Sequence, residues 1–393
     1  MKKILIMMMV VALLLAGCQT SDSLESNNVE ESVVNNIEVS EVNNDDVTSS
    51  TVEVNFDSDM FTERDMIQTY DETDFTKLNL ESYSDINIDE EGTYLISGQA
   101  EEVTINIDVE NEKVQLVLDA LTITNEDKPI INIISADKVF ITSINENTLT
   151  VSDSIVTDEE AVIYSKADLV LNGSGTLDIT ANHTQGVDSK DDLKITGSVI
   201  NIESDGHGLE ANDSIRVAGG QINITTNEDA FHSENNDDDT LGYIYITGGE
   251  INIKAGDDGL RATSIFEMDG GTVNIETCVE GIEATQVVID GGQIHIYSTD
   301  DGINATQKSS LDVMIVVNDG SIYIEMAQGD TDGFDANGDL FINGGTISVD
   351  AVSAFDADGL AELNGGTVTV NGEIITEITM QHPGGQGPGR KRP

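Results

Sequence analysis

A repeat of about 22 residues runs through the middle of the chain and constrains the fold more than any other feature. Two independent markers keep this period. The first is a Gly-Gly or similar turn followed by an Ile-x-Ile alternation, found from Gly197-Ser198 to Gly365-Gly366. The second is a small residue, an apolar residue, any residue, and then Ala or Ser, found from Gly186-Val187 to Ala354-Phe355. Two markers that share one period predict a solenoid whose coils each carry short strands.

Apolar and polar residues alternate within each repeat, and this period of two indicates strands rather than helices. The Gly-Gly pairs would also break helices. Ile222 and Ile224 are expected to face inward and to stack on their equivalents about 4.8 Å away in the next coil, with Asn223 facing outward. The sequence therefore predicts an all-β parallel solenoid of about 22 residues per coil, with roughly thirteen coils between Glu81 and Ile375.

The first 18 residues form a targeting segment with two lysines, an apolar run from Ile4 to Ala16, and the ending Leu15-Ala16-Gly17-Cys18. The run is too short for a membrane-spanning helix and is typical of a secretory signal. Its ending resembles the lipobox of bacterial lipoproteins, which implies that Cys18 receives a diacylglyceryl group and becomes the mature N-terminus. In the alternative, an ordinary signal peptide, the protein is exported as well. We therefore expect an exported protein that contacts the bilayer through its lipid anchor only, on the outer face of the cell membrane.

Composition divides the rest of the chain. Residues 19–75 are rich in Asn, Ser, Glu and Asp with few aromatic residues, which predicts an acidic, disordered tether. Residues 76–376 hold the repeats, and residues 377–393 form a Gly/Pro-rich tail. Cys278 is the one cysteine besides Cys18, so no intrachain disulfide framework forms after lipidation. We expect Cys278 to be buried as a small apolar side chain.

The charge balance narrows the class of partner. Lys and Arg number 17 against 74 Asp and Glu, which gives a formal net charge of −57. Nucleic acid binding is excluded, because it needs clustered basic residues and the basic run Arg390-Lys391-Arg392 lies in the tail. We expect a monomer whose partners are cations, or polyanions that are reached through cations.

Stacked coils would gather acidic residues into two rows on one edge of the solenoid. The upstream row, one position before the small residue of the second marker, consists of Gln185, His207, Asp229, Asp258, Glu280, Asp301, Asp332 and Ser353. The downstream row, two positions after that small residue, consists of Asp188, Glu210, His232, Arg261, Glu283, Asn304, Asp335 and Asp356. Carboxylates about 5 Å apart repel by roughly 3 kcal/mol per pair at an effective dielectric constant of 20. Since basic residues are scarce, Ca²⁺, a hard cation with six to eight oxygen ligands, is the expected cofactor.

Two acidic clusters are the sharpest candidates for a metal site. The first combines Asp229, Asp237 and Asp238 from an insertion that lengthens its coil, and Asp257 and Asp258 one coil later. The remaining candidate ligands are the second cluster and other row positions, namely Asp332, Asp335, Asp356, Asp188, Glu210 and Asp301. In the alternative, these residues are solvated turn formers, as Asp-Gly commonly is, and their pKa values rise without bound metal.

Several stretches, in order along the chain, resemble a family of bacterial exported carbohydrate-binding proteins with bound calcium. The resemblance spans roughly Leu78 to Ile375 and is carried by Gly92–Gly98, Lys113–Asp119, Ala136–Thr142, Asp229–Asp239, Gly242–Gly249 and Gly256–Leu260. It implies a single-stranded, right-handed parallel β-helix that binds acidic or neutral cell-wall polysaccharide, such as polygalacturonate or cellulose, without catalysis. It also implies calcium ligation by Asp229, Asp237, Asp238, Asp257, Asp258, Asp332 and Asp335. His232 and Arg261 depart from the pattern, which puts a calcium site in their coils in doubt.

Two other function classes stay open. Pectate lyases and polygalacturonases share the β-helix, and a lyase needs an Arg or Lys base beside calcium, for which Arg261 is the best candidate. The motifs around His207, Asp229 and Asp258 stand in the wrong order for a polygalacturonase and lack its Arg-x-Lys, so we assign no catalytic residue. The third class is a surface adhesin or stalk that calcium makes rigid. Four tyrosines could stack on sugar rings or pack within the domain, namely Tyr243, Tyr245, Tyr297 and Tyr323.

Overall fold

A computed structural model describes residues 60–157, 159–329 and 331–379. These residues belong to the second of two compact units of the chain, Thr51–Pro393. The signal segment with Cys18, the first part of the expected tether and most of the Gly/Pro-rich tail lie outside the described residues. Within the described ranges, no helix is long and apolar enough to cross a membrane.

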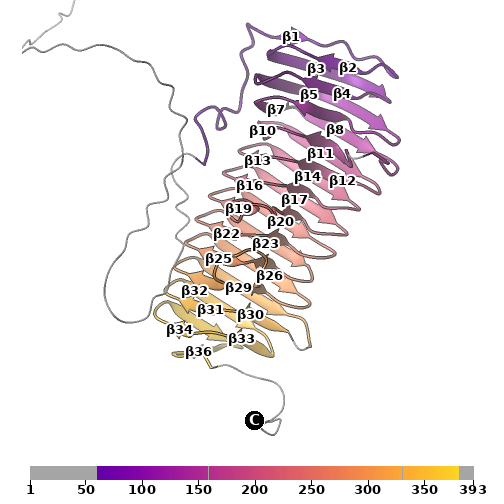
Figure 1. Ribbon diagram of the computed structural model, residues 1–393. Helices are drawn as coiled ribbons and strands as arrows, with labels where there is room; N and C mark the ends of the chain where they lie inside the picture. Colours follow the sequence, from indigo (N-terminus) through magenta and orange to yellow (C-terminus); the bar gives the residue numbers. More distant parts are fainter. Residues whose placement is uncertain (1–59, 158, 330, 380–393) are drawn as a thin grey trace, which may run out of the picture. The chain divides into compact units, whose positions relative to one another are not determined.

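The strands of the described ranges wind into stacked coils (Figure 1). A typical coil contains β14 (Val199–Ser204), β15 (Leu209–Ala211) and β16 (Ser214–Val217). Each strand pairs in parallel with its equivalent one coil later, namely β17 (Gln221–Thr226), β18 (Phe231–Ser233) and β19 (Tyr243–Ile246). The all-β parallel solenoid predicted from the repeat is confirmed.

The strands form two sheets. Sheet B has 12 strands: β2 (Ile86–Ile88), β4 (Ile105–Asp108), β6 (Ile131–Ser135), β9 (Ala161–Ser165), β12 (Gln185–Ser189), β15, β18, β21 (Leu260–Ala262), β24 (Ile282–Ala284), β27 (Ile303–Ala305), β30 (Asp332–Ala336) and β33 (Ser353–Ala357). Sheet A has 24 strands. Its column A1, which follows sheet B in each coil, comprises β7 (Lys138–Ile144), β10 (Asp168–Gly173), β13 (Asp192–Ile195), β16, β19, β22 (Ile265–Met268), β25 (Gln286–Ile289), β28 (Met314–Val317), β31 (Asp339–Ile342) and β34 (Ala361–Leu363). Its column A2, which precedes sheet B, comprises β8 (Glu146–Val151), β11 (Thr176–Ala181), β14, β17, β20 (Glu250–Lys254), β23 (Thr272–Thr277), β26 (Gln293–Ser298), β29 (Ser321–Met326), β32 (Thr346–Asp350) and β35 (Thr367–Val370).

The remaining strands of sheet A lie at the two ends of the solenoid. The N-terminal strands are β1 (Thr76–Lys77), β3 (Gly92–Glu101) and β5 (Lys113–Asn125), and β5 is long enough to pair with both β7 and β8. At the other end, β36 (Glu373–Ile375) turns back and pairs antiparallel with β35. All other strand pairings in the described residues are parallel, so β36 interrupts the pattern that the coils repeat.

The 12 strands of sheet B correspond to fewer coils than the roughly thirteen expected. Coil length varies along the chain, because Leu193 pairs with Ile215 but Val139 pairs with Leu169, 30 positions later (169 − 139). Stacking fixes the register of the strands and leaves the turns between them free to lengthen. The long N-terminal coils therefore use up residues that the 22-residue estimate assigned to an additional coil.

The inward side chains form one continuous core. Ile222 and Ile224, predicted to face inward, are at most 2% exposed, and Phe231 of the second marker is fully buried. Asn223 lies on the outer face and is only partly buried. Cys278 is 2% exposed within this core, as expected for a structural thiol. Because each side chain stacks on a chemically similar one, the repeat buries apolar surface at every coil.

Both sequence markers have a steric cause. Gly220, in the Gly-Gly turn, has φ +97°, and a Cβ there would lie 2.6 Å from the carbonyl oxygen of Gly197. Gly208 holds the small position of the second marker, where a Cβ would lie 2.8 Å from the carbonyl oxygen of Ala230. The second marker therefore allows successive coils to approach closely beside the upstream row.

Residues 60–74 pack against column A1, although the sequence predicted a tether up to residue 75. Asp65 is fully buried, with its carboxylate 3.4 Å from Lys138 Nζ and 3.7 Å from Lys194 Nζ. Phe61 stacks on Tyr245 with ring centroids 6.5 Å apart. These two buried lysines lie two coils apart, and Asp65 adds to the counter-charge that Asp168 and Asp192 supply.

Candidate functional site

The two rows predicted from the stacking lie together on sheet B. In the downstream row, each residue is in register with its equivalent one coil later, through the pairs Asp188–Glu210, Glu210–His232, His232–Arg261, Arg261–Glu283, Glu283–Asn304, Asn304–Asp335 and Asp335–Asp356. In the upstream row, the backbone N–H of Gly208 donates to the Asp229 carbonyl, and that of Ala230 donates to the Asp258 carbonyl. The stacking order of both rows is confirmed.

Side chains of the upstream row take part in holding the coils together. Asp258 N–H donates to Asp229 Oδ1 at 2.9 Å, and Glu280 N–H donates to Asp258 Oδ1 at 3.3 Å. Asp332 N–H donates to Asp301 Oδ1 at 3.1 Å in the same way. Each of these carboxylates accepts the backbone N–H of the next coil with one oxygen. The second oxygen of each carboxylate makes other contacts, as Asp229 Oδ2 does with His232.

The crowding of carboxylates raises their pKa values. Burial and the charges of Asp229 and Glu280 raise the pKa of Asp258 to about 8. Burial and the charge of Glu283 raise the pKa of Glu280 to about 7. Similar causes raise the pKa of further row members, to about 7 for Asp301 and about 6 for Asp335 and Asp188. The rows are therefore short of positive charge at neutral pH.

Buried oxygens without a hydrogen-bond partner in the described residues gather on the same rows. Those on the rows are Gln185 Oε1, Asp188 Oδ1, Glu210 Oε2, Asn304 Oδ1 and Ser353 Oγ, and Ser204 Oγ and Ser233 Oγ lie outside the rows. Buried polar atoms are almost always satisfied in folded proteins, so these acceptors are candidates for contacts with water or with a cation. Oxygen acceptors of this kind are what a hard cation binds.

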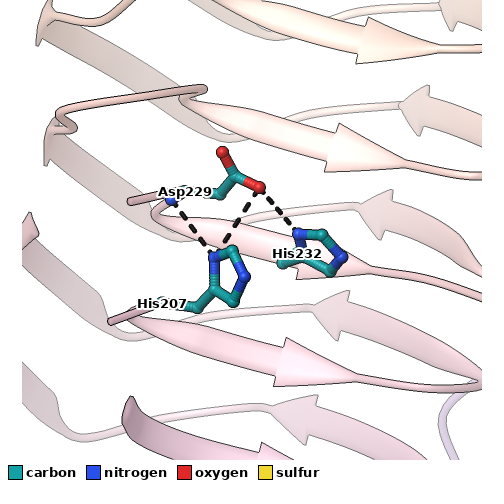
Figure 2. A group of neighbouring side chains, drawn as sticks. All are labelled: His207, Asp229 and His232. Atoms are coloured by element: carbon teal, nitrogen blue, oxygen red, sulfur yellow. Dashed lines mark hydrogen bonds and ion pairs between the residues drawn. The ribbon is translucent and has the colours of Figure 1, made fainter. Parts of the chain in front are cut away.

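Asp229 lies between two histidines at the centre of the rows (Figure 2). His232 Nδ1 is 2.6 Å from Asp229 Oδ2, and His207 Nδ1 is 3.6 Å from the same oxygen. Asp229 N–H donates to His207 Nδ1 at 3.2 Å, which makes that nitrogen an acceptor. Burial opposes charge on these groups, but hydrogen bonding lowers the pKa of Asp229 and raises the pKa of His232. Protonated His232 therefore supplies part of the positive charge that Asp229 needs.

Two acidic groups lie along the rows, one that includes Asp229 and one that begins a coil further on at Asp258. Oxygen atoms of Asp229, Asp257 and Asp258 all lie within 4.8 Å of one another. Asp258, Glu280 and Glu283 form a second such group. Asp229, Asp257 and Asp258, expected together from the sequence, are therefore brought together, and Asp258 links the two groups.

Asp237 and Asp238 lie away from these groups, contrary to the expected cluster. They follow β18, whereas Asp229 precedes it, so a whole strand separates them. Both are exposed, and the Asp238 carboxylate accepts hydrogen bonds from the Thr240 N–H and hydroxyl. Closeness along the chain was misleading because the intervening strand carries the insertion to the other corner of the coil.

The second expected cluster is more open. Asp335 pairs with Asp356 across neighbouring strands, and Asp332 contacts Asp301 through its N–H. In the part of the chain that the structure describes, no three carboxylates around Asp332 and Asp335 offer oxygens within 4.8 Å of one another. Asp188 and Glu210 lie at the opposite end of the downstream row, and Lys190 Nζ is 2.8 Å from Asp188 Oδ2.

Sequence analysis missed one acidic group, which lies on column A1. Glu267, Asp269 and Asp290 have oxygens within 4.8 Å of one another, and Tyr245 donates its hydroxyl to Asp269 at 2.6 Å. Burial and the charges of Asp269 and Asp290 raise the pKa of Glu267 to about 8. The signal was present in the sequence, since an Asp precedes the Gly-Gly turn in two successive coils.

The tyrosines divide between buried and exposed positions. Tyr243 and Tyr245 are 7% exposed and pack near Met60 and Phe61, so they are not open to sugar rings. Tyr297 is 36% exposed.

Comparison with known proteins identifies the family. A family model described as carbohydrate-binding domain-containing protein matches residues 82–333, well over half of the chain. The chain belongs to this family. The matched segment runs from before β2 into β30, so it includes the upstream row from Gln185 to Asp332 and both acidic groups at Asp258.

A curated protein and a solved structure are each similar to part of this chain. A carbohydrate-binding domain-containing protein of Acetivibrio thermocellus is 33% identical over 137 residues, which cover 31% of this chain and 46% of the relative. The match thus spans less than half of that relative. A solved structure titled as a polysaccharide lyase-like protein from C. thermocellum, gadolinium derivative, is 29% identical. It covers 56% of this chain and 92% of its own, with a TM-score of 0.46.

Arg261 is the best candidate that the sequence offers for lyase chemistry, ahead of Lys190, Lys194, Arg216 and Lys254. Its Nη1 is 3.8 Å from Asp229 Oδ2, and its Nε is 3.4 Å from Glu283 Oε2. Burial alone would lower the pKa of Arg261, but the charges of Asp229 and Glu283 raise it. A general base needs a lowered pKa, so these surroundings favour an ion-pairing role for Arg261.

Proposed function

We propose that the protein is a non-catalytic, calcium-dependent carbohydrate-binding lipoprotein, exported and anchored outside the cell membrane. Its proposed ligand is an acidic cell-wall polysaccharide such as polygalacturonate. Family membership supports carbohydrate binding. The proposal for calcium rests on the rows of sheet B, and the proposal for the anchor rests on the ending of the signal segment at Cys18.

The observation that carries the proposal is the crowding of carboxylates around Asp258. Asp229, Asp257 and Asp258 place oxygens within 4.8 Å of one another, and so do Asp258, Glu280 and Glu283 from neighbouring coils. A proton can neutralise one carboxylate, but it satisfies only one or two acceptors. A cation with six to eight ligands can satisfy several acceptors from two coils at once.

The residues present fit calcium. Asp229, Asp257 and Asp258 would hold one ion, and Asp258 with Glu280 and Glu283 would hold a neighbouring one. When bound, calcium would supply positive charge and open coordination positions to an outside ligand. The carboxylates of this chain would bind and orient the ion, while their backbone-bonded oxygens keep the coils in register.

The same arrangement explains how a chain of net charge −57 could bind a polyanion. Without cations, the carboxylates of the protein and of polygalacturonate repel each other. Ions held on sheet B could complete their coordination with carboxylates and hydroxyls of the polysaccharide. Binding should then require calcium and disappear with a chelator.

Affinity electrophoresis in polygalacturonate gels, with calcium and with chelator, tests the proposal. We expect retardation of the wild-type protein only with calcium, and reduced retardation of Asp258→Asn. Asp237→Asn is the matched control, because its carboxylate lies in the exposed insertion, and it should migrate as the wild type. Migration that calcium does not alter would reject the proposed function and favour a stalk.

A polysaccharide lyase is the second candidate, favoured by one observation, the position of Arg261 3.8 Å from Asp229 and its acidic group. Release of unsaturated products that absorb in the near ultraviolet, lost in Arg261→Gln, would establish this activity. With no such products under conditions where calcium-dependent retardation occurs, the non-catalytic function stands.

A further inference from the structure

Two long connections leave sheet B at the same corner. Residues 234–242 join β18 to β19, and residues 306–313 join β27 to β28. The connections of the two coils between them are short, with residues 263–264 after β21 and Thr285 after β24. The long connections meet, because the Ser310 N–H donates to Asp239 Oδ1 at 3.1 Å and the Ser310 hydroxyl donates to the same carboxylate. They form the walls of a gap whose floor is the shorter coils.

This gap contains a hollow of about 210 Å³. It is lined by His232, Ser233, Glu234, Asn236, Arg261, Thr263 and Lys308. Ligand pockets for drug-sized molecules measure about 300–1,000 Å³, so this hollow suits a single small group such as one sugar ring. Insertions in solenoid proteins commonly build the binding face.

The hollow gathers positive charge in a chain that has little of it. Arg261 and Lys308 line it, although the whole chain has only 17 Lys and Arg. Both pair with the same atom, because Glu283 Oε2 lies 3.4 Å from Arg261 Nε and 2.8 Å from Lys308 Nζ. Glu283 is therefore shared by the two cations, and Asp229 Oδ2, which also pairs with His232, makes a longer contact of 3.8 Å with Arg261. An anion in the hollow would compete with these contacts for Arg261 and Lys308.

The guanidinium of Arg261 still has donors to offer. It carries five N–H groups, and none of them makes a hydrogen bond of good geometry within the described residues. Its side chain is 32% exposed, and that of Lys308 is 20% exposed. A guanidinium matches a carboxylate with two parallel hydrogen bonds, and an ammonium adds a point charge.

We propose that this hollow binds the carboxylate of a single uronic acid residue directly, through Arg261 and Lys308, without calcium. The proposal rests on the proposed function in one respect, since it assigns a second contact to the same class of acidic polysaccharide. Asn236, which is exposed, offers its amide group to the sugar hydroxyls, and Thr263 lines the hollow on the next coil. A doubly charged phosphate is disfavoured, because Glu234 and Glu283 lie close by.

Isothermal titration of the full chain with galacturonate in the presence of chelator tests this inference, with galactose and the methyl ester of galacturonate as neutral probes. We expect binding of the acid alone. Arg261→Gln and Lys308→Gln should each weaken it by about tenfold or more, since bonds to charged groups are the strong ones. Arg261→Lys should restore part of the affinity. Equal binding of the neutral sugars, or no binding of galacturonate, overturns the proposal.

Lys254→Gln is the matched control, because Lys254 also pairs with a single Glu, at 2.9 Å from Glu276, but lies on column A2. It should bind galacturonate as the wild type does, and all variants should keep the wild-type circular dichroism spectrum. The chelator separates the two proposals. If the wild type shows calcium-dependent gel retardation but does not bind galacturonate in chelator, only this inference is rejected. If it binds galacturonate in chelator but calcium does not alter its migration, only the calcium proposal is rejected.

Discussion

Column A2 and sheet B both stack polar side chains from coil to coil, but the stacked groups attract one another on A2 and repel one another on sheet B. On A2, Asn223 Nδ2 donates to Asn201 Oδ1 at 2.7 Å, and Asn252 Nδ2 donates to Asn223 Oδ1 at 3.1 Å. On sheet B, Asp229 and Asp258 stack with only acceptor oxygens. An amide carries both donor and acceptor, so a stack of amides satisfies itself. A carboxylate stack cannot, and it must obtain protons, basic side chains or metal from elsewhere.

The comparison teaches where a solenoid gains function. In the asparagine stack, each amide donates a hydrogen bond to the amide of the preceding coil, so these amides satisfy one another without an outside ligand. A stack of aspartates instead places like charges next to one another on one edge. Their repulsion lowers the free energy of unfolding of the cation-free protein, so a bound cation stabilises the fold more. Both stacks follow from the same parallel, in-register pairing of strands, and only the side-chain chemistry differs.

Calcium should produce the largest change in stability. Each occupied site stabilises the fold by about 2.7 kcal/mol when free calcium is 100-fold above its dissociation constant. Thermal unfolding with calcium and with chelator should show a clear rise in Tm with calcium, and a smaller one with magnesium, which demands stricter geometry. An unchanged Tm would mean that protons and basic residues already satisfy the rows.

The pH dependence of the calcium-free protein should be the next largest effect. The folded pKa values of Asp258 and Glu280, about 8 and about 7, lie above those of unfolded chains. Between about pH 4 and pH 8 the folded state therefore binds more protons, so stability falls as pH rises, by up to about 1.4 kcal/mol per pH unit for each such group. Denaturant unfolding at pH 5 and pH 8 with chelator measures this fall. Greater stability at pH 8 would contradict it.

Asn223→Asp introduces the acidic chemistry into the amide stack. The new oxygen would face Asn201 Oδ1, which loses its donor, so we expect a loss of about 1–3 kcal/mol in the free energy of unfolding. Denaturant titration measures it. Asn364→Asp is the control, because Asn364 is exposed near the end of the solenoid and should cost less. Equal losses would show that register, rather than donor pairing, decides the cost.

Asp258→Asn makes the opposite exchange. It keeps an oxygen for the Glu280 N–H and removes one charge from the row. With chelator, we expect the variant to be more stable than the wild type at pH 9 by about 1 kcal/mol, and little changed at pH 6, where Asp258 is already protonated. Its response to calcium should shrink. Greater stability of the wild type at pH 9 would contradict the repulsion proposed between carboxylates of the row.

Asp237→Asn and Asp238→Asn should have the smallest effect. Both residues are exposed in the insertion and lie apart from the acidic groups, so Tm with and without calcium should match the wild type. A reduced calcium response in either variant would restore the sequence-based ligand set and contradict the placement of the insertion.

Sequence alone predicted the register of the rows because the second marker has a steric cause. Gly208 and its equivalents must be small because the next coil lies close to them. The residue before each of them, such as His207, and the second residue after each, such as Glu210, therefore take the same place in every coil. The marker therefore determined side-chain neighbours dozens of residues apart. Alternation likewise determined that Ile222 faces the core.

Turns and local crossings could not be predicted in the same way. Stacking places no limit on turn length, so the long N-terminal coils reduced the coil count, and the insertion with Asp237 moved to another corner. The packing of Asp65 on two buried lysines joins chain segments that no repeat relates. The hollow at Arg261 and Lys308 likewise depends on the lengths of two connections.

The antiparallel return of β36 onto β35 limits growth of the solenoid. An ordinary last coil would offer column A2 the same parallel edge that every coil offers its successor, and a second molecule could add there, head to tail. The hydrogen bonds of β36 run in the reversed pattern, which a parallel newcomer cannot continue in register. Because β36 occupies the edge of β35, a second molecule cannot extend column A2 with a parallel strand.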